Sequence, residues 1–279
     1  MAKKAYVGVG GIARKIKKGY IGIGGKARKI KKAYIGVGGV ARPCWSDGLE
    51  YYGTTTPLSK GRYGLAAASV GDYALFGGGY NDWASSVVDA YNASLTHSTP
   101  AALSTERRGL AATAVGSYAL FGGGNSGGTA YYNKVDSYNT SLTKGTASAL
   151  TVARASLAAT TVGNYAQFGG GNEELSSNPV ATVDAYDTSL TRSTPIALSA
   201  ARSGIGATAV GGYALFGGGE LGSGNSAIVD AYDENLTRIT LPIFSSARYG
   251  LAATSVGVYA LFGGGSPSAS SAIVDVYAA

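Results

Sequence analysis

Residues Arg62 to Gly79 read RYGLAAASVGDYALFGGG, and the rest of the chain is organised around this stretch. The stretch returns four times, beginning at Arg107, Arg154, Arg202 and Arg248. Each of these arginines stands 15 residues before the first glycine of a GGG triplet. Because similarity at a fixed period of this length is the signature of repeat architectures, the sequence predicts five similar structural units.

A second landmark, Val-Asp-x-Tyr, follows each glycine triplet. Its aspartates are Asp89, Asp136, Asp184, Asp230 and Asp275. From each of the first four aspartates to the next repeat's arginine there are always 18 residues, whereas the distance from the last glycine to the aspartate varies from 10 to 13. A constant scaffold that carries one variable loop per repeat is how repeat folds vary their binding surface.

Each repeat reads as four short strands. In the first repeat we expect them at residues 65–70, 73–76, 87–91 and 95–103. No segment carries a helix-length apolar period of 3.6 residues, which argues against helical solenoids and Rossmann folds. Four strands in every 45 to 48 residues are typical of a β-propeller blade. The fold class that we predict is all-β, a five-bladed β-propeller.

The pattern YALFGGG, a loop and VDAY resembles the kelch family, whose blades carry a Gly-Gly doublet at the end of the second strand. The resemblance covers residues 48–279 and implies a kelch-like propeller. Kelch blades usually place a tryptophan on the fourth strand, whereas this chain has Leu95, Leu142, Leu190 and Leu236 near that place. The functions of animal kelch adaptors are therefore not carried over.

The ends of the repeat array indicate how the ring closes. The fifth repeat stops at Ala279, directly after its third predicted strand. Upstream of Arg62, the TPLS of residues 56–59 matches the TPAALS that precedes Arg107. Since an open strand edge is an aggregation hazard, we expect residues 49–59 to supply the fourth strand of the last blade.

The net charge of +7 is divided unevenly along the chain. Residues 1–44 hold 12 Lys and Arg and no acid, and residues 45–279 hold 11 basic and 16 acidic residues. Such an asymmetry indicates a basic arm, residues 1–44, that docks on something anionic, and a separate propeller, residues 45–279. The single cysteine, Cys44, excludes a disulfide framework within one chain. With no signal peptide and no run of membrane-spanning length, we expect synthesis in the cytoplasm and no membrane insertion.

The basic arm is itself a repeat of 14 residues: KKAYVGVGGIARKI, KKGYIGIGGKARKI and KKAYIGVGGVARPC. A Gly-Gly pair between β-branched residues is a signal for a two-residue turn, so the arm predicts three hairpins in series. The alternative is a disordered basic tail. The residues expected to make attachment contacts are Tyr6, Lys17, Tyr20, Lys31 and Tyr34.

These KKAYIGVGG-type units are similar to the N-terminal segments of predicted tail or appendage proteins in phages and prophages of Gram-positive bacteria. The resemblance implies that residues 1–44 attach to virion or tail proteins. It also implies a location in the virion or phage tail and an exposed, target-binding role for the remaining residues.

Several chemical motifs are absent or incomplete. The stretch Gly24-Gly25-Lys26 lacks the remaining residues of a phosphate-binding loop. His97 is the only histidine, so there is no Ser-His-Asp set and no histidine-based metal centre, and we expect no cofactor. The five arginines and five aspartates could form a ring of catalytic or metal-binding carboxylates. A pair repeated in every unit is more often a structural device, and we expect it to tie a blade to its neighbour.

The candidate binding residues lie in the variable loops and beside the fixed arginines. They are Tyr63, Tyr80, Asp82, Trp83, Arg108, Tyr131, Tyr132, Glu173, Glu174 and Tyr249. Aromatic rings with neighbouring acids and amides suit the recognition of a glycan or a protein surface, because they bury area at little entropic cost. The alternative is that these are neutral, solvated loops.

We therefore expect a non-enzymatic attachment and recognition protein of a phage or phage-derived tail, acting as a homo-oligomer. The arm would anchor to the particle, and the propeller loops would recognise a cell-surface glycan or protein. One alternative is a purely structural fibre or decoration subunit. Another is a glycan-degrading propeller enzyme, whose acids would be Asp82, Glu173 and Glu174.

The purified arm is expected to co-assemble with a virion or tail partner at a few hundred millimolar salt, measured by co-sedimentation. Its Tyr, Ile and Val residues supply apolar burial, which survives when the Debye length falls to a few Å. Nucleic-acid binding through Lys and Arg would weaken steeply with salt. Release at that salt, together with binding only to DNA or RNA, would replace the attachment hypothesis by a nucleic-acid one.

Overall fold

The computed structural model describes residues 54–173, 178–266 and 270–279, and the backbone of six strands between Tyr6 and Ser46. The chain divides into two compact units, Met1–Thr55 and Thr56–Ala279, which are treated separately below. The described residues contain β-strands and no α-helix. Accordingly, none of them forms a helix that could span a membrane.

The first unit contains three antiparallel hairpins. They are β1 (Tyr6–Val9) with β2 (Ile12–Lys15), β3 (Gly19–Ile23) with β4 (Lys26–Ile30), and β5 (Lys32–Val37) with β6 (Val40–Ser46). The prediction of three hairpins is confirmed. In the third hairpin the register shifts between Ala33 and Tyr34, opposite Pro43. Proline cannot donate to a ladder, and such irregular positions are where strands accommodate it.

The second unit contains the five repeats, each folded as one antiparallel sheet. The first three sheets are β7 (Ala66–Val70), β8 (Tyr73–Gly77), β11 (Val88–Asn92), β12 (His97–Ser98); β13 (Ala111–Val115), β14 (Tyr118–Gly122), β15 (Val135–Asn139), β16 (Lys144–Thr146); and β17 (Ala158–Val162), β18 (Tyr165–Gly169), β21 (Val183–Tyr186), β22 (Arg192–Ser193). The last two are β23 (Gly206–Val210), β24 (Tyr213–Gly217), β27 (Val229–Asp233), β28 (Arg238–Leu241); and β29 (Ala252–Val256), β30 (Tyr259–Gly263), β31 (Val274–Ala278).

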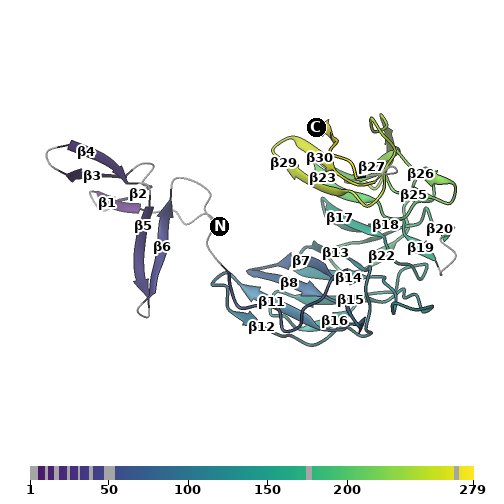
Figure 1. Cartoon of the computed structure of the whole chain (residues 1–279), viewed down its shortest axis with the longest axis horizontal. Helices are drawn as coiled ribbons and strands as arrows, with labels where there is room; N and C mark the ends of the chain where they lie inside the picture. Colours follow the sequence, from purple (N-terminus) through teal and green to yellow (C-terminus); the bar gives the residue numbers. More distant parts are fainter. Residues whose placement is uncertain are drawn as a thin grey trace. The chain divides into compact units, whose positions relative to one another are not determined.

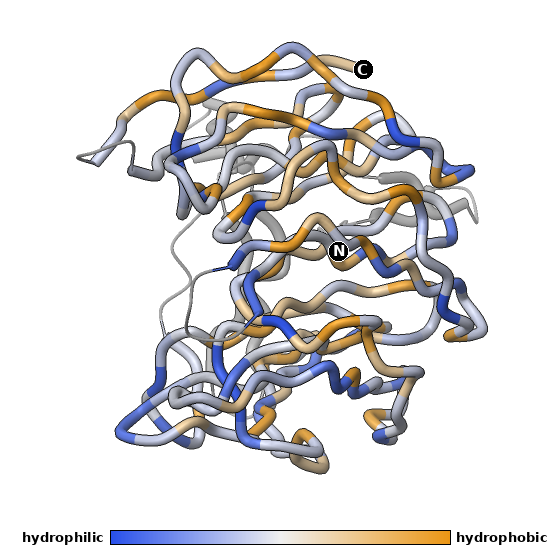
Figure 2. The backbone as a smooth tube through the Cα atoms, turned by 90° about the vertical axis from the view of Figure 1, so that its right-hand side faces the viewer, coloured by the Kyte–Doolittle hydropathy of each residue, from blue (hydrophilic) through white to orange (hydrophobic). Residues whose placement is uncertain are grey.

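The sheets follow one another in chain order around the second unit (Figure 1). Their first strands pack in succession, β7 on β13, β13 on β17, β17 on β23 and β23 on β29. Along the backbone of this unit, hydrophobic stretches alternate with hydrophilic ones (Figure 2). The architecture is thus an all-β array of repeated sheets, consistent with a β-propeller-like fold.

The fourth strand of the first sheet is shorter than predicted. The sequence indicates a strand over residues 95–103, whereas β12 spans only His97–Ser98. Leu95 lies in the preceding turn with φ 61°. After β12 the chain leaves the sheet, because the carbonyl of Ala101 accepts a hydrogen bond from the Tyr138 hydroxyl of the next repeat at 2.7 Å.

Consecutive sheets fit together through a phenylalanine and a glycine. A β-carbon placed on Gly77 would lie 2.8 Å from Cε1 of Phe121 in the next repeat, and one on Gly122 would lie 2.8 Å from Phe168. Phe121 and Phe168 are fully buried. The first glycine of the triplet therefore leaves the space that the next repeat's ring fills, because glycine has no side chain to block it.

A ladder of backbone hydrogen bonds also links the repeats. Each repeat donates to the one before it: Gly109 to Gly64 (3.1 Å), Ser156 to Gly109 (2.8 Å), Gly204 to Ser156 (2.9 Å) and Gly250 to Gly204 (2.9 Å). These residues and the following Leu or Ile of every repeat line one shared cavity of about 620 Å³. All five repeats therefore converge on a common opening.

The fifth sheet differs from the others on its outward face. Val256 is 64% exposed and Val274 is 52% exposed, whereas their counterparts Val70 and Val88 are 3% and 1% exposed. A β-carbon on Gly263 would meet only Val274, at 3.5 Å, and no phenylalanine. Among the described residues, nothing packs on this face as the next repeat packs on the other four.

The closing strand predicted at residues 49–59 is described only in part. Residues 49–53 lie outside the described residues, and residues 54–59 form no strand. Thr56 and Ser59 bond to the first repeat, to the Tyr91 hydroxyl (2.8 Å) and to Asp89 (3.0 Å). Ring closure by this segment stays a prediction.

One buried residue departs from the repeat pattern. Gln167 takes the place that leucine holds in the other four repeats, at Leu75, Leu120, Leu215 and Leu261. Gln167 is fully buried, and neither its amide oxygen nor its amide nitrogen has a hydrogen-bond partner among the described residues. A buried polar group without a partner loses its hydration without compensation.

Replacing Gln167 by leucine is expected to stabilise the protein by about 1–3 kcal/mol, because it removes this uncompensated desolvation at nearly equal volume. Thermal and urea unfolding of Gln167→Leu measure the effect. The reciprocal variant Leu120→Gln is the control and is expected to destabilise by a similar amount. A lower melting temperature for Gln167→Leu would contradict this explanation.

Candidate functional site

The variable loop of the first repeat folds into a small hairpin that presents a tryptophan. Its strands are β9 (Tyr80–Asn81) and β10 (Trp83–Ala84). Asp82 makes the turn with φ 61°, a conformation that aspartate tolerates better than most residues. The Asn81 side chain donates to the carbonyl of Gly61 at 2.8 Å and holds the hairpin down. Trp83 is left 76% exposed.

Three predicted residues meet at the base of this hairpin. Tyr63 and Tyr80 exchange two backbone hydrogen bonds of 3.0 and 2.7 Å, and their rings lie 5.6 Å apart. The guanidinium of Arg108 lies 4.5 Å from the centre of the Tyr80 ring, on the ring face. Such a cation–π contact holds Arg108 against the first repeat.

The variable loop of the second repeat folds over the same tyrosine. The Asn125 side chain accepts hydrogen bonds from the backbone N–H of Gly127 at 2.9 Å and from Nε of Arg108 at 3.4 Å. Gly127 has φ 85°, and a β-carbon there would lie 2.8 Å from the Tyr80 ring. Only glycine allows the loop to approach Tyr80 this closely.

The two loops enclose a cavity of about 540 Å³ between the first and second repeats. It is lined by Tyr80, Trp83, Ala84, Glu106, Ser126, Gly127, Gly128 and Tyr132. Its size falls within the range of small-molecule binding sites. The structure therefore brings the predicted residues Tyr80, Trp83 and Tyr132 into one pocket, with Tyr63 and Arg108 behind Tyr80. We call this pocket the aromatic cavity.

The other predicted loop residues do not line the aromatic cavity. The Tyr131 hydroxyl accepts a 3.4 Å hydrogen bond from Asn172 of the third repeat. Glu173 lies in the two-residue strand β19 (Asn172–Glu173), which pairs with β20 (Asn178–Pro179). Tyr249 forms an isolated bridge with Ser266. Glu174, Lys17 and Lys31 lie outside the described residues.

Glu106 is a lining residue that the sequence reasoning missed. It immediately precedes the buried Arg107 and is exposed. A signal was present in the repeat alignment, because the equivalent residues are Gly61, Ala153, Ala201 and Ala247. Because the other four repeats have glycine or alanine at this position, the fold does not require an acid there.

The arginine and the aspartate of each repeat form an ion pair inside that repeat. The nitrogen–oxygen distances are 2.8 Å for Arg62–Asp89, 2.8 Å for Arg107–Asp136, 2.9 Å for Arg154–Asp184 and 2.7 Å for Arg248–Asp275, and Arg202 pairs with Asp230. The expectation that the Arg–Asp pair ties a blade to its neighbour is therefore wrong, because the pair forms within one repeat. The arginine backbone, not its ion pair, contacts the neighbouring repeat. For example, the carbonyl of Arg107 accepts from Gly79 at 2.9 Å.

Hydrogen bonds hold the Asp89 carboxylate in its ionised form. Burial alone would raise the pKa of Asp89, but bonds from the Ser59 N–H, the His97 ring and the Arg62 guanidinium outweigh it and lower the pKa to about 2. A carboxylate with so low a pKa is poorly suited to exchange protons near neutral pH. No group of three or more possible metal ligands occurs in the part of the chain described here. This geometry favours the structural interpretation of the pairs.

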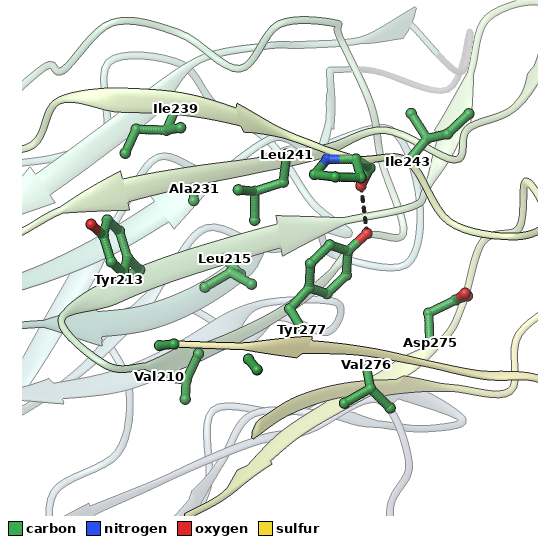
Figure 3. Close-up of a pocket in the computed structure, with 13 residues that line it drawn as sticks. Val210, Tyr213, Leu215, Ala231, Ile239, Leu241, Ile243, Asp275, Val276 and Tyr277 are labelled. Carbon is green, nitrogen blue, oxygen red and sulfur yellow. Dashed lines mark hydrogen bonds between the residues drawn. The ribbon is translucent and has the colours of Figure 1, made fainter. Parts of the chain in front are cut away.

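A second cavity, of about 640 Å³, lies at the free edge of the fifth sheet (Figure 3). Ile239, Leu241 and Ile243 contribute from one side and Val276 and Tyr277 from β31. In two earlier gaps between repeats, Leu142 and Leu190 pack against the corresponding clusters. No predicted site residue lines this second cavity.

Comparisons with known proteins bear on the fold. No protein-family model matches the sequence, and no curated protein matches it. The solved structures with a similar fold include "Structure of YjhT", with a TM-score of 0.63 and 15% identity, over 76% of this chain and 75% of that chain. At this identity the likeness concerns the fold alone, and it supports an all-β array of repeated sheets.

Proposed function

We propose that this chain is a non-enzymatic attachment and recognition protein of a phage or phage-derived tail, which binds a cell-surface receptor through the aromatic cavity. The observation that carries the proposal is the convergence of Tyr80, Trp83 and Tyr132 on one cavity between two variable loops. Exposed tryptophan and tyrosine on a rigid scaffold are the side chains that dominate recognition surfaces.

Two further features support a binding role for this cavity. Trp83 has the largest exposed fraction of any large hydrophobic residue described, 76%. The turn that presents it uses a positive φ at Asp82, and the facing loop depends on a positive φ at Gly127. Backbone conformations that most residues rarely adopt occur at functional sites more often than elsewhere.

The N-terminal unit takes the role of anchor in this proposal. Its three hairpins carry the tyrosines Tyr6, Tyr20 and Tyr34 at one repeated position each, and 12 basic residues without an acid lie in residues 1–44. A virion or tail protein with an acidic, partly apolar surface complements this composition. The resulting location is the virion, with the repeats exposed to the target cell.

We further propose that the five repeats close into a five-bladed kelch-like ring in which the fifth repeat packs on the first. The two ends are complementary. Phe76 of the first repeat is only half-buried, whereas the equivalent Phe121 is fully buried. At the other end, Gly263 offers the space that Gly77 offers to Phe121. Residues 49–59 would complete the fifth sheet.

A second candidate function follows from the same two ends. If the fifth repeat packs on the first repeat of another copy, the contact is head-to-tail, and such contacts build filaments or rings of several subunits. The exposed Val256, Val274 and Val276 favour this candidate. The protein would then be a fibre or decoration subunit. Mass measurement on dilute full-length protein separates the candidates, since ring closure leaves a monomer.

Replacing Trp83 and Tyr132 together by alanine is expected to abolish adhesion of the labelled full-length chain to intact Gram-positive cells. Because both are loop residues, the free energy of unfolding should change by no more than about 0.5 kcal/mol for each. Tyr213→Ala, an exposed tyrosine outside the aromatic cavity, is the control. Normal adhesion by the double variant would place recognition elsewhere.

Ring closure predicts how an added methyl group at Gly263, in the last repeat, changes the stability of the protein. Gly263→Ala should destabilise the protein as much as Gly122→Ala, about 1–3 kcal/mol, because both would crowd a phenylalanine of the next repeat. With an open end, Gly263→Ala should instead stabilise by about 0.5–1 kcal/mol, since glycine weakens a strand. Thermal unfolding of both variants at low protein concentration gives the comparison.

Two N-terminal deletions test whether residues 49–59 complete the fifth sheet. Deleting residues 1–53 is expected to cause aggregation through the free edge of β31, whereas deleting residues 1–44 leaves a soluble protein. Both deletions retain Thr56 and Ser59, which bond to the first repeat. Soluble monomers from both deletions would contradict the role of residues 49–53.

A further inference from the structure

We infer that the aromatic cavity binds the uncharged pyranose rings of a neutral oligosaccharide and discriminates against acidic glycans. The inference rests on the proposed recognition function and narrows its ligand to one chemical class. It is carried by three properties of the cavity: the aromatic rings that line it, the polar groups on those rings, and the sign of the charge around it.

The rings offer a surface that suits a sugar. A pyranose has one face of C–H groups and a rim of hydroxyls, and an aromatic ring has an electron-rich face. Trp83 presents its ring at 76% exposure, and Tyr80 and Tyr132 line the same cavity. The cavity volume of about 540 Å³ is that of a site for a drug-sized ligand, which suits a short oligosaccharide.

The polar atoms on these rings are available to a ligand. The hydroxyls of Tyr80 and Tyr132 and the indole N–H of Trp83 form no hydrogen bond with the described residues, whereas the hydroxyls of Tyr138 and Tyr186 bond to backbone carbonyls. Unpaired donors beside an apolar surface match the hydroxyl rim of a sugar. A ligand without such groups would leave them unpaired and would be rejected.

The charge around the cavity is negative. Glu106 is the only charged residue among those that line it, and Asp82 immediately precedes Trp83. Arg108 lies against the Tyr80 ring and Asn125, contacts that leave its positive charge in place, so the two acids exceed it by one negative charge. A sialic acid, a uronic acid or a phosphate would therefore meet a net negative charge. Neutral and N-acetylated sugars do not meet this repulsion.

The test uses Trp83 as its own reporter. The chain has two tryptophans, Trp45 and Trp83, so full-length Trp45→Phe leaves Trp83 as its single tryptophan, whose emission is excited selectively over that of the tyrosines. The probes are lactose, 3′-sialyllactose, tri-N-acetylchitotriose and its deacetylated, cationic form. We expect saturable changes in fluorescence with lactose or tri-N-acetylchitotriose. Binding of 3′-sialyllactose should be at least about tenfold weaker than binding of lactose, because of carboxylate repulsion.

Two conservative variants assign the effect to the groups named. Glu106→Gln should reduce the difference in affinity between lactose and 3′-sialyllactose. Tyr132→Phe should weaken the binding of the neutral sugars, because it removes one hydroxyl. Glu234→Gln, an exposed acid in the fourth repeat, is the matched control and should change neither. Preference for 3′-sialyllactose, or an unchanged preference for lactose over it in Glu106→Gln, would overturn the inference. Because the acids attract cations, the cationic sugar should lose any advantage over tri-N-acetylchitotriose in Glu106→Gln, and an advantage that persists in this variant would also overturn it.

Failure of this inference is distinguishable from failure of the proposed function. If no sugar perturbs Trp83 while Trp83→Ala abolishes adhesion to cells, the recognition site stands, and its ligand is a protein surface rather than a neutral glycan. If Trp83→Ala adheres like the parent chain, the proposed function itself fails at this cavity. A saturable change in Trp83 fluorescence with a neutral sugar that disappears in Tyr132→Ala supports both the recognition site and its neutral-glycan ligand.

Discussion

The buried arginine that opens each repeat is the interaction on which the array depends. The backbone of Arg107 bonds to the preceding repeat, donating to Ser85 at 3.0 Å and accepting from Gly79 at 2.9 Å. Its side chain bonds to its own repeat, to Asp136 at 2.8 Å and to the carbonyl of Phe121 at 3.0 Å. One residue thus joins two sheets. Since a buried charge that loses its partner is strongly destabilising, Asp136 must lie at a fixed place.

This constraint explains why the scaffold could be predicted from the sequence. The spacing from arginine to GGG is constant because the arginine side chain bonds to that strand, as Arg62 does to the carbonyls of Phe76 and Gly78. The aspartate meets the same arginine in three dimensions, as in Arg62 and Asp89, although the loop before it varies in length. The fourth strand was overestimated for the opposite reason. The Thr and Ser residues after Leu95 suit a strand locally, but the next repeat draws the chain away through Tyr138 and Asp136. Such distant hydrogen bonds leave no local pattern.

The candidate site was predictable to a similar degree. Tyr80 and Trp83 stand in the one segment of the repeat whose length varies, so their composition pointed to recognition. That they share a cavity with Tyr132 follows from the approach of Gly127 to the Tyr80 ring, which sequence patterns do not encode. Glu106 belongs to a connection between repeats, and its proximity to Trp83 depends on the same approach. The sequence thus indicated which residues are candidates for recognition, but not that they come together in one cavity.

Because the aromatic cavity lies partly in the first repeat, recognition is linked to whether the fifth repeat packs on the first. Tyr63, Tyr80 and Trp83 belong to the first repeat, and terminal units of a linear array have a neighbour on one side only. The opposite end shows the consequence, because Asp275 is 16% exposed in its side chain whereas Asp136 is fully buried. A ring in which the fifth repeat supports the first would hold the tyrosines in place before the ligand arrives. Since ordering a site beforehand lowers the entropic cost of binding, ring closure would strengthen recognition without touching the ligand.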